Sequence, residues 1–82
     1  METIIVEVIL GGFEETAQFI LPTHVPVATL MDEIIRQVKL VYWNVEYDSS
    51  AVLYSADSQQ VLQSQWTLAQ NGILEGSSLI LI

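Results

Sequence analysis

The N-terminal part of the chain carries two runs of β-type residues joined by a glycine pair. Thr3 to Leu10 (TIIVEVIL) is rich in β-branched residues, and Gly11-Gly12 follows it at once as a turn signal. Phe13 to Leu21 (FEETAQFIL) then alternates, so the two runs predict a β-hairpin. The two-residue period of a strand separates an outward set from an inward set. The expected inward set is Ile4, Val6, Val8, Leu10, Ala17, Phe19 and Leu21.

The apolar spacing changes to a helical period after the loop Pro22-Thr23-His24. Pro26 suits the first turn of a helix, where its missing N–H costs no hydrogen bond. We expect this helix to end between Lys39 and Asn44. The residues that follow three- and four-residue steps along one face are Val27, Leu30, Ile34, Val38 and Val41.

The second half of the chain predicts shorter elements, after a polar loop at residues 44–50. We expect strands at 52–55, 60–62 and 78–82, with a helical turn before the last strand that Thr67 caps and Gly72 ends. Ile73 is expected to anchor this turn to the core. The order is ββαββ, followed by the helical turn and a final strand, which predicts an α+β fold in which one helix covers one face of a mixed sheet. Residues 1–82 are expected to form a single domain.

The charge balance restricts the partners that such a domain can bind. Ten acidic residues stand against Lys39 and Arg36, which gives a net charge of −8. This chain lacks the basic surface with which proteins neutralise phosphates, so neither nucleic acid nor an anionic membrane is an expected partner. There is no cysteine, so the chain has neither disulfides nor thiolate metal ligands. It also has no apolar run of about 18 residues, so we expect no membrane insertion. The N-terminus does not resemble a signal peptide, and a cytoplasmic location is therefore expected.

No arrangement of residues in the sequence predicts catalysis, a metal site or a cofactor. His24 is the only histidine and is expected to be a plain loop residue. Glu14 and Glu15 are adjacent on a strand, so their carboxylates should face opposite sides. The remaining acids of interest lie in predicted loops, where acids are common: Asp48, Asp57 and Glu75. We therefore expect a protein that is not an enzyme.

The sequence resembles the β-grasp fold of ubiquitin and, more closely, the YukD (EsaB) family of bacterial type VII (Esx) secretion loci. The helix carries one part of this resemblance, in Pro26, Val27, Leu30, Asp32 and Gln37. The closing pattern carries the other part, in Leu68, Gly72, Ile73, Gly76, Leu79 and Leu81. The resemblance implies a central last strand, flanked by the first and third strands. It also implies a non-enzymatic adaptor or regulator of the secretion system.

The resemblance further implies which partners to expect: an FtsK-like ATPase or another membrane component of the machinery, or a second copy in a homodimer. Conjugated ubiquitin-like proteins carry a flexible tail that ends in Gly-Gly. Here the only glycine pair is Gly11-Gly12 and the sequence ends inside a predicted strand, so we expect a non-conjugating protein. Two alternatives remain, which are an accessory subunit of an oxygenase-type enzyme complex and a structural homo-oligomer.

Two surfaces are candidates for protein binding. In ubiquitin the face of the sheet away from the helix carries the apolar patch that binds partners, and Tyr54 resembles its central isoleucine. The residues expected on that face are Ile5, Ile20, Tyr54, Ile80 and Ile82. The competing interpretation is that they are single apolar residues scattered on a small surface. The second candidate surface is Tyr42 and Trp43, although Trp43 alternatively folds under the 44–50 loop.

Overall fold

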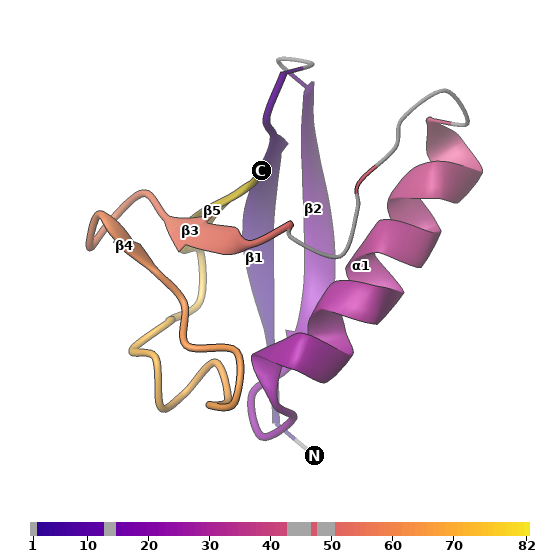
Figure 1. Ribbon diagram of the computed structural model, residues 1–82. Helices are drawn as coiled ribbons and strands as arrows, with labels where there is room; N and C mark the ends of the chain where they lie inside the picture. Colours follow the sequence, from indigo (N-terminus) through magenta and orange to yellow (C-terminus); the bar gives the residue numbers. More distant parts are fainter. Residues whose placement is uncertain (1, 13–14, 43–46, 48–50) are drawn as a thin grey trace.

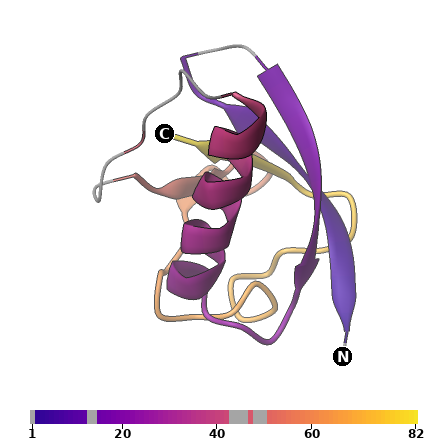
Figure 2. The ribbon, with the colours of Figure 1, turned by 90° about the vertical axis from the view of Figure 1, so that its right-hand side faces the viewer.

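The computed structural model describes residues 2–12, 15–42, 47 and 51–82. Its five strands form one sheet in the order β2-β1-β5-β3-β4, and helix α1 lies across one face (Figures 1 and 2). This arrangement confirms the β-grasp prediction, including the central place of the last strand between the first and the third. The elements are β1 (Thr3–Leu10), β2 (Glu15–Pro22), α1 (Val27–Val41), β3 (Leu53–Ser55), β4 (Gln60–Val61) and β5 (Ser78–Leu81).

Strands β1 and β2 form the predicted hairpin and pair antiparallel over their whole length, from Thr3 opposite Pro22 to Leu10 opposite Glu15. Gly12 has a φ of 86°, a left-handed conformation that glycine adopts without steric cost, so it suits the turn between the strands. The strand predicted from Phe13 is described from Glu15 onward, since residues 13–14 lie outside the described part. The inward set is confirmed: Val6, Val8, Leu10, Phe19 and Leu21 are buried, and Ile4 and Ala17 pack against them.

Strand β5 pairs parallel with β1 and antiparallel with β3. Its Leu79 and Leu81 are fully buried on the face that α1 covers. The prediction extended this strand to Ile82, which the structure places just beyond it. Ile82 still continues the ladder, because its N–H and carbonyl both hydrogen-bond to Val52, at 3.0 and 2.8 Å.

Helix α1 buries the face that the sequence predicted for its first three turns, through Val27, Leu30, Ile34 and Val38. The prediction was wrong for Val41, which is 71% exposed, while Tyr42 packs against the core. At 3.6 residues per turn, position 42 lies closer than position 41 to the line through Val38. Tyr42 therefore takes the place expected for Val41.

The start of α1 is tied to the segment that precedes the last strand. Pro26 is the N-cap residue, one position before the first turn where the sequence placed it, and provides no side-chain cap. The N–H groups of Val27 and Ala28 instead donate to the carbonyls of Trp66 and Ser64, both at 2.8 Å. Backbone carbonyls thus satisfy the first two N–H groups of the helix, which have no partner within it.

The predicted turn before the last strand is present and is capped as expected. Thr67 Oγ1 accepts from the N–H of Gln70 at 3.1 Å, and Gln70 Oε1 accepts from the N–H of Thr67 at 2.9 Å. This reciprocal pair is a capping box. Turn residues run to Gly72, whose φ is 76°, and Ile73 is buried as predicted.

Candidate protein-binding surface

A row of apolar side chains crosses the face of the sheet that α1 leaves open. In the register of the sheet, Ile9 of β1 lies beside Ile80 of β5. Ile80 in turn lies opposite Tyr54 of β3, and Tyr54 lies opposite Val61 of β4. Directly paired residues share one face, and the neighbours Leu10, Leu53, Leu79 and Leu81 are buried on the other. The row therefore forms one continuous strip across four strands.

Val52 and Ile82 extend this strip by one more pair at the end of β5. Each lies two residues along its chain from a member of the row, so both point to the same face. Val61 and Ile82 are 51% and 56% exposed, Val52 is exposed, and the other members are half-buried. We call these six residues the outer apolar surface: Ile9, Val52, Tyr54, Val61, Ile80 and Ile82.

Gly11 makes room for Ile82 at the edge of the outer apolar surface. A Cβ atom at Gly11 would lie 2.6 Å from Ile82 Cγ2 and 2.8 Å from the carbonyl oxygen of Leu81. Both separations are shorter than real carbon contacts. The Gly11 N–H also donates to that same oxygen at 2.8 Å, so the backbone is held where a side chain does not fit.

The structure does not bring all five predicted outer-face residues together. Tyr54, Ile80 and Ile82 belong to the outer apolar surface, whereas Ile5 and Ile20 form a separate exposed pair on β1 and β2. The row between the two groups is polar and consists of Gln18, Glu7 and Ser78. The two groups therefore lie about four residues apart along the strands, which is roughly 13 Å.

Sequence reasoning missed three members of this surface: Ile9, Val52 and Val61. Ile9 is absent from the inward set that alternation predicts for the first strand, so alternation puts it with Ile5 on the outward face. What the sequence did not provide was the register, which puts Ile9 beside Ile80 and Val61 opposite Tyr54. Alternation along a strand determines the face of the sheet to which a side chain points. Its neighbours on adjacent strands depend on the register between distant segments of the chain.

The second candidate surface is only partly described. Tyr42 is half-buried against the core and forms the C-cap of α1, where its N–H donates to the carbonyl of Val38 at 2.7 Å. Trp43 lies outside the described residues. Leu40 and Val41 beside them are exposed. The arrangement assigns Tyr42 a place in the packing of the helix end.

Two acids that the sequence placed in plain loops accept hydrogen bonds from the backbone of strands β1 and β5. Glu75 Oε2 accepts from the N–H of Ile5 at 2.7 Å, and Asp57 Oδ2 accepts from the N–H of Ser78 at 3.0 Å. Hydrogen bonds from a backbone N–H to a carboxylate are stronger than those between neutral groups. These acids therefore serve the sheet on either side of the start of β5.

The histidine and the other acids weighed in the sequence as site residues lie as expected where they are described. His24 is exposed in the turn before α1, and Glu15 is exposed on β2, while Glu14 and Asp48 lie outside the described residues. Within the described ranges, no three His, Asp or Glu side chains gather as a metal site would require. In the same part of the chain, no helix has the length and apolar character needed to cross a membrane.

Comparison with known proteins places this geometry in a family context. The profile of a family described as "WXG100 protein secretion system (Wss), protein YukD" matches residues 3–81. No functionally curated protein matches the chain significantly.

Three similar solved structures belong to type VII or ESX secretion proteins. The ubiquitin-like domain of Mycobacterium tuberculosis ECCD1 is 22% identical, with coverage of 100% of this chain and 99% of that one and a TM-score of 0.78. The EccD5 ubiquitin-like domain of Mycobacterium xenopi is 17% identical, with coverage of 100% and 94% and a TM-score of 0.80. A chain of an ESX-5 inner membrane complex is 16% identical over 100% of this chain and 21% of its own length, with a TM-score of 0.79. At such identities the likeness shows the ubiquitin-like fold.

Proposed function

The chain belongs to the YukD family of the WXG100 protein secretion system, and we propose that it acts there as a small adaptor that binds other proteins of the machinery non-covalently. The observation that carries this proposal is the outer apolar surface. Its six side chains form a continuous strip on the face that the helix leaves open. Apolar patches of this kind on small soluble domains mark sites of protein interaction.

The size and chemistry of this surface suit a specific contact of moderate strength. Burial of apolar area contributes about 25 cal/mol per Å² before the costs of association. Tyr54, at the centre of the row, is of a residue type that often dominates binding energy. Such a surface supports reversible binding and requires no chemistry from the domain.

The partner that we propose is a cytosolic part of the secretion machinery, such as its FtsK-like ATPase or another membrane component. A chain of an ESX-5 inner membrane complex matches this fold over 21% of its own length, which supports a place for the present domain at a membrane complex of the machinery. The family match favours this role over the oxygenase-subunit alternative.

The test is a calorimetric titration of the full chain with the purified cytosolic domains of the ATPase and of the membrane components of the same secretion system. Ile80→Asp and Tyr54→Ala should each weaken binding at least about tenfold, because both remove apolar contact at the centre of the row. Leu74→Asp is the matched control, since Leu74 is exposed but lies outside the surface. We expect the control to bind within about twofold of the native chain.

Light scattering of the isolated chain separates the homodimer from the adaptor. A dimer through the outer apolar surface becomes monomeric with Ile80→Asp and keeps its mass with Leu74→Asp. Wild-type affinity in both surface variants, or no binding to any component of the machinery, contradicts the proposal. Circular dichroism and urea unfolding of each variant show that the fold is retained.

A further inference from the structure

Strand β2 is an edge of the sheet, and its pairing with β1 shows which of its backbone groups face solvent. On β1, the backbone N–H of Glu7 donates to the carbonyl of Ser77 at 3.0 Å, and the carbonyl of Ile5 accepts from the N–H of Gly76 at 2.8 Å. The backbone groups of Ile5 and Glu7 therefore point toward β5 and away from β2.

The alternation of an antiparallel pair then fixes the outward groups of β2. The partners of Ile5 and Glu7 are Ile20 and Gln18, so these residues form non-hydrogen-bonded pairs with β1. Their N–H and carbonyl groups, with those of Thr16 two residues earlier, point to the open edge. Among the described residues, no backbone group pairs with them. The edge ends at Pro22, which has no N–H to offer.

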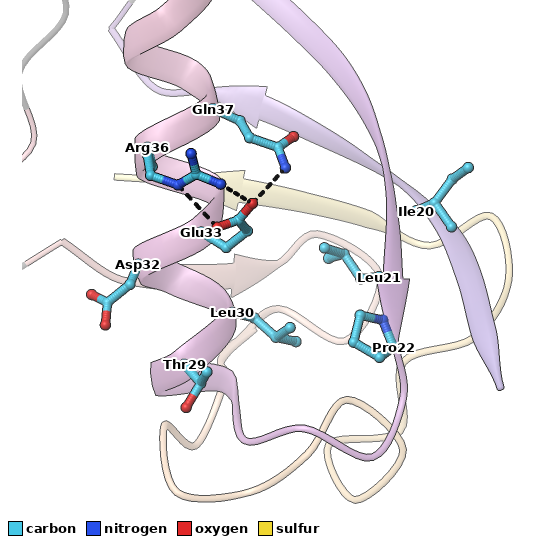
Figure 3. Close-up of a pocket in the computed structure, with 9 residues that line it drawn as sticks. All are labelled: Ile20, Leu21, Pro22, Thr29, Leu30, Asp32, Glu33, Arg36 and Gln37. Carbon is cyan, nitrogen blue, oxygen red and sulfur yellow. Dashed lines mark hydrogen bonds and ion pairs between the residues drawn. The ribbon is translucent and has the colours of Figure 1, made fainter. Parts of the chain in front are cut away.

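A groove of about 600 Å³ runs between this edge and helix α1 (Figure 3). Leu21 of β2 and Leu30 of α1 point toward each other across it and form an apolar floor. The wall on the helix side is polar and includes Glu33, Arg36 and Gln37. The groove thus combines free strand-pairing groups on one side with an apolar floor beside them.

The charges along the groove favour a positively charged occupant. Arg36 is occupied by Glu33, through Nη2 to Oε1 at 2.6 Å and Nε to Oε2 at 3.1 Å, and Gln37 Nε2 donates to the same carboxylate at 2.9 Å. Asp32 lies at the rim of the groove, where its side chain points away from β2 (Figure 3), and among the described residues no cation lies within ion-pair distance of it. The whole chain carries a net charge of −8, so its field attracts cations to this site.

We propose that an extended basic peptide segment of a partner protein adds to the edge of β2 as a further strand. Its backbone pairs with Thr16, Gln18 and Ile20, as in other cases of strand addition. Alternate apolar side chains of the segment lie over Leu21 and Leu30, and its Lys or Arg side chains lie beside Asp32. A second copy of the chain is a poorer occupant, because edge-to-edge pairing brings two acidic surfaces together.

This site is separate from the outer apolar surface, so it extends the proposed function to a second contact. Selection of a displayed library of random peptides, each about ten residues long, against the full chain provides the probe. We expect enriched peptides that alternate apolar residues with Lys or Arg. Their binding should protect the amides of Thr16, Gln18 and Ile20 from hydrogen exchange.

Gln18→Pro tests the backbone contact directly. The Gln18 N–H points to the open edge, so proline removes a group needed by the peptide and no bond to β1. This variant should bind the selected peptides at least about tenfold more weakly, whereas Gln18→Ala, which keeps the N–H, should stay within about twofold. Asp32→Lys, at an exposed position, should weaken binding roughly threefold to tenfold.

Several results overturn the inference: no enrichment from the library, enrichment of acidic peptides, or unchanged binding to Gln18→Pro. If Gln18→Pro fails to fold by circular dichroism, the exchange measurement on the native chain decides, and absent protection of the β2 amides contradicts strand addition. Ile80→Asp should bind the selected peptides like the native chain. A failure of the outer apolar surface as a binding site is thus distinguishable from a failure of the β2 edge.

Discussion

The two faces of the central strand β5 carry similar side chains in very different surroundings. Leu79 and Leu81 are fully buried against the helix side, whereas Ile80 is half-buried and Ile82 is 56% exposed. The inner pair is accounted for by folding, since α1 covers it. The outer pair lies on a face with no covering element among the described residues. The inner apolar residues therefore serve stability, whereas the outer ones remain available for the binding that we propose.

The largest effect that separates the two faces is expected from truncation of a single leucine. Leu81→Ala should lower the free energy of unfolding by about 3 kcal/mol, because it leaves a cavity in a fully buried site. Ile80→Ala on the outer face should cost about 1 kcal/mol or less, since less of its area is buried. Urea unfolding of both variants measures the difference, provided that the slope of the unfolding free energy against urea concentration is the same in both. Equal losses would show that the outer face is as important to folding as the inner one.

The inner face could be predicted well from the sequence because local rules determine it. Strand alternation assigned Val6, Val8 and Leu10 to the core, and all three are fully buried. Helical spacing did the same for the first three turns of α1. It failed at Val41, where a step of three and a step of four compete and Tyr42 occupies the inward position.

The outer face could be predicted only in part because its grouping depends on register. Alternation placed Ile5 and Ile80 on one face, but the parallel pairing of β1 with β5 separates them and joins Ile9 to Ile80 instead. That pairing links segments some seventy residues apart, and so does the hydrogen bond from the Ile5 N–H to the Glu75 carboxylate, whose residues are 70 positions apart. Local residue patterns carry no measure of such a register. The role of Glu75 was missed for the same reason.

An intermediate effect is expected from Gly11→Ala, which adds one methyl group to the outer face. The new Cβ would meet the Leu81 carbonyl at 2.8 Å, and that oxygen is fixed by its bond to the Gly11 N–H. We expect a loss of about 2 kcal/mol in unfolding free energy from this overpacking. Gly12→Asn is the matched control, because Gly12 has open space around it and asparagine tolerates its positive φ. A loss in the control as large as in Gly11→Ala would place the strain in the turn rather than at Ile82.

The smallest effect is expected at the exposed polar contacts of α1 that form the helix-side wall of the groove. Hydrogen bonds from Arg36 and Gln37 hold the pKa of Glu33 below its ordinary value of 4.5. A carboxyl group with a lowered pKa in the folded state stabilises the fold above its unfolded pKa, and this contribution is lost as the pH falls through the folded pKa. The fall in Tm from neutral to acidic pH should therefore be smaller for Glu33→Gln than for the native chain. The difference should shrink further in high salt, because the pair is exposed. An acid dependence of Tm that is identical in the two proteins would mean that this contact adds nothing to the stability that the buried face of the sheet already provides.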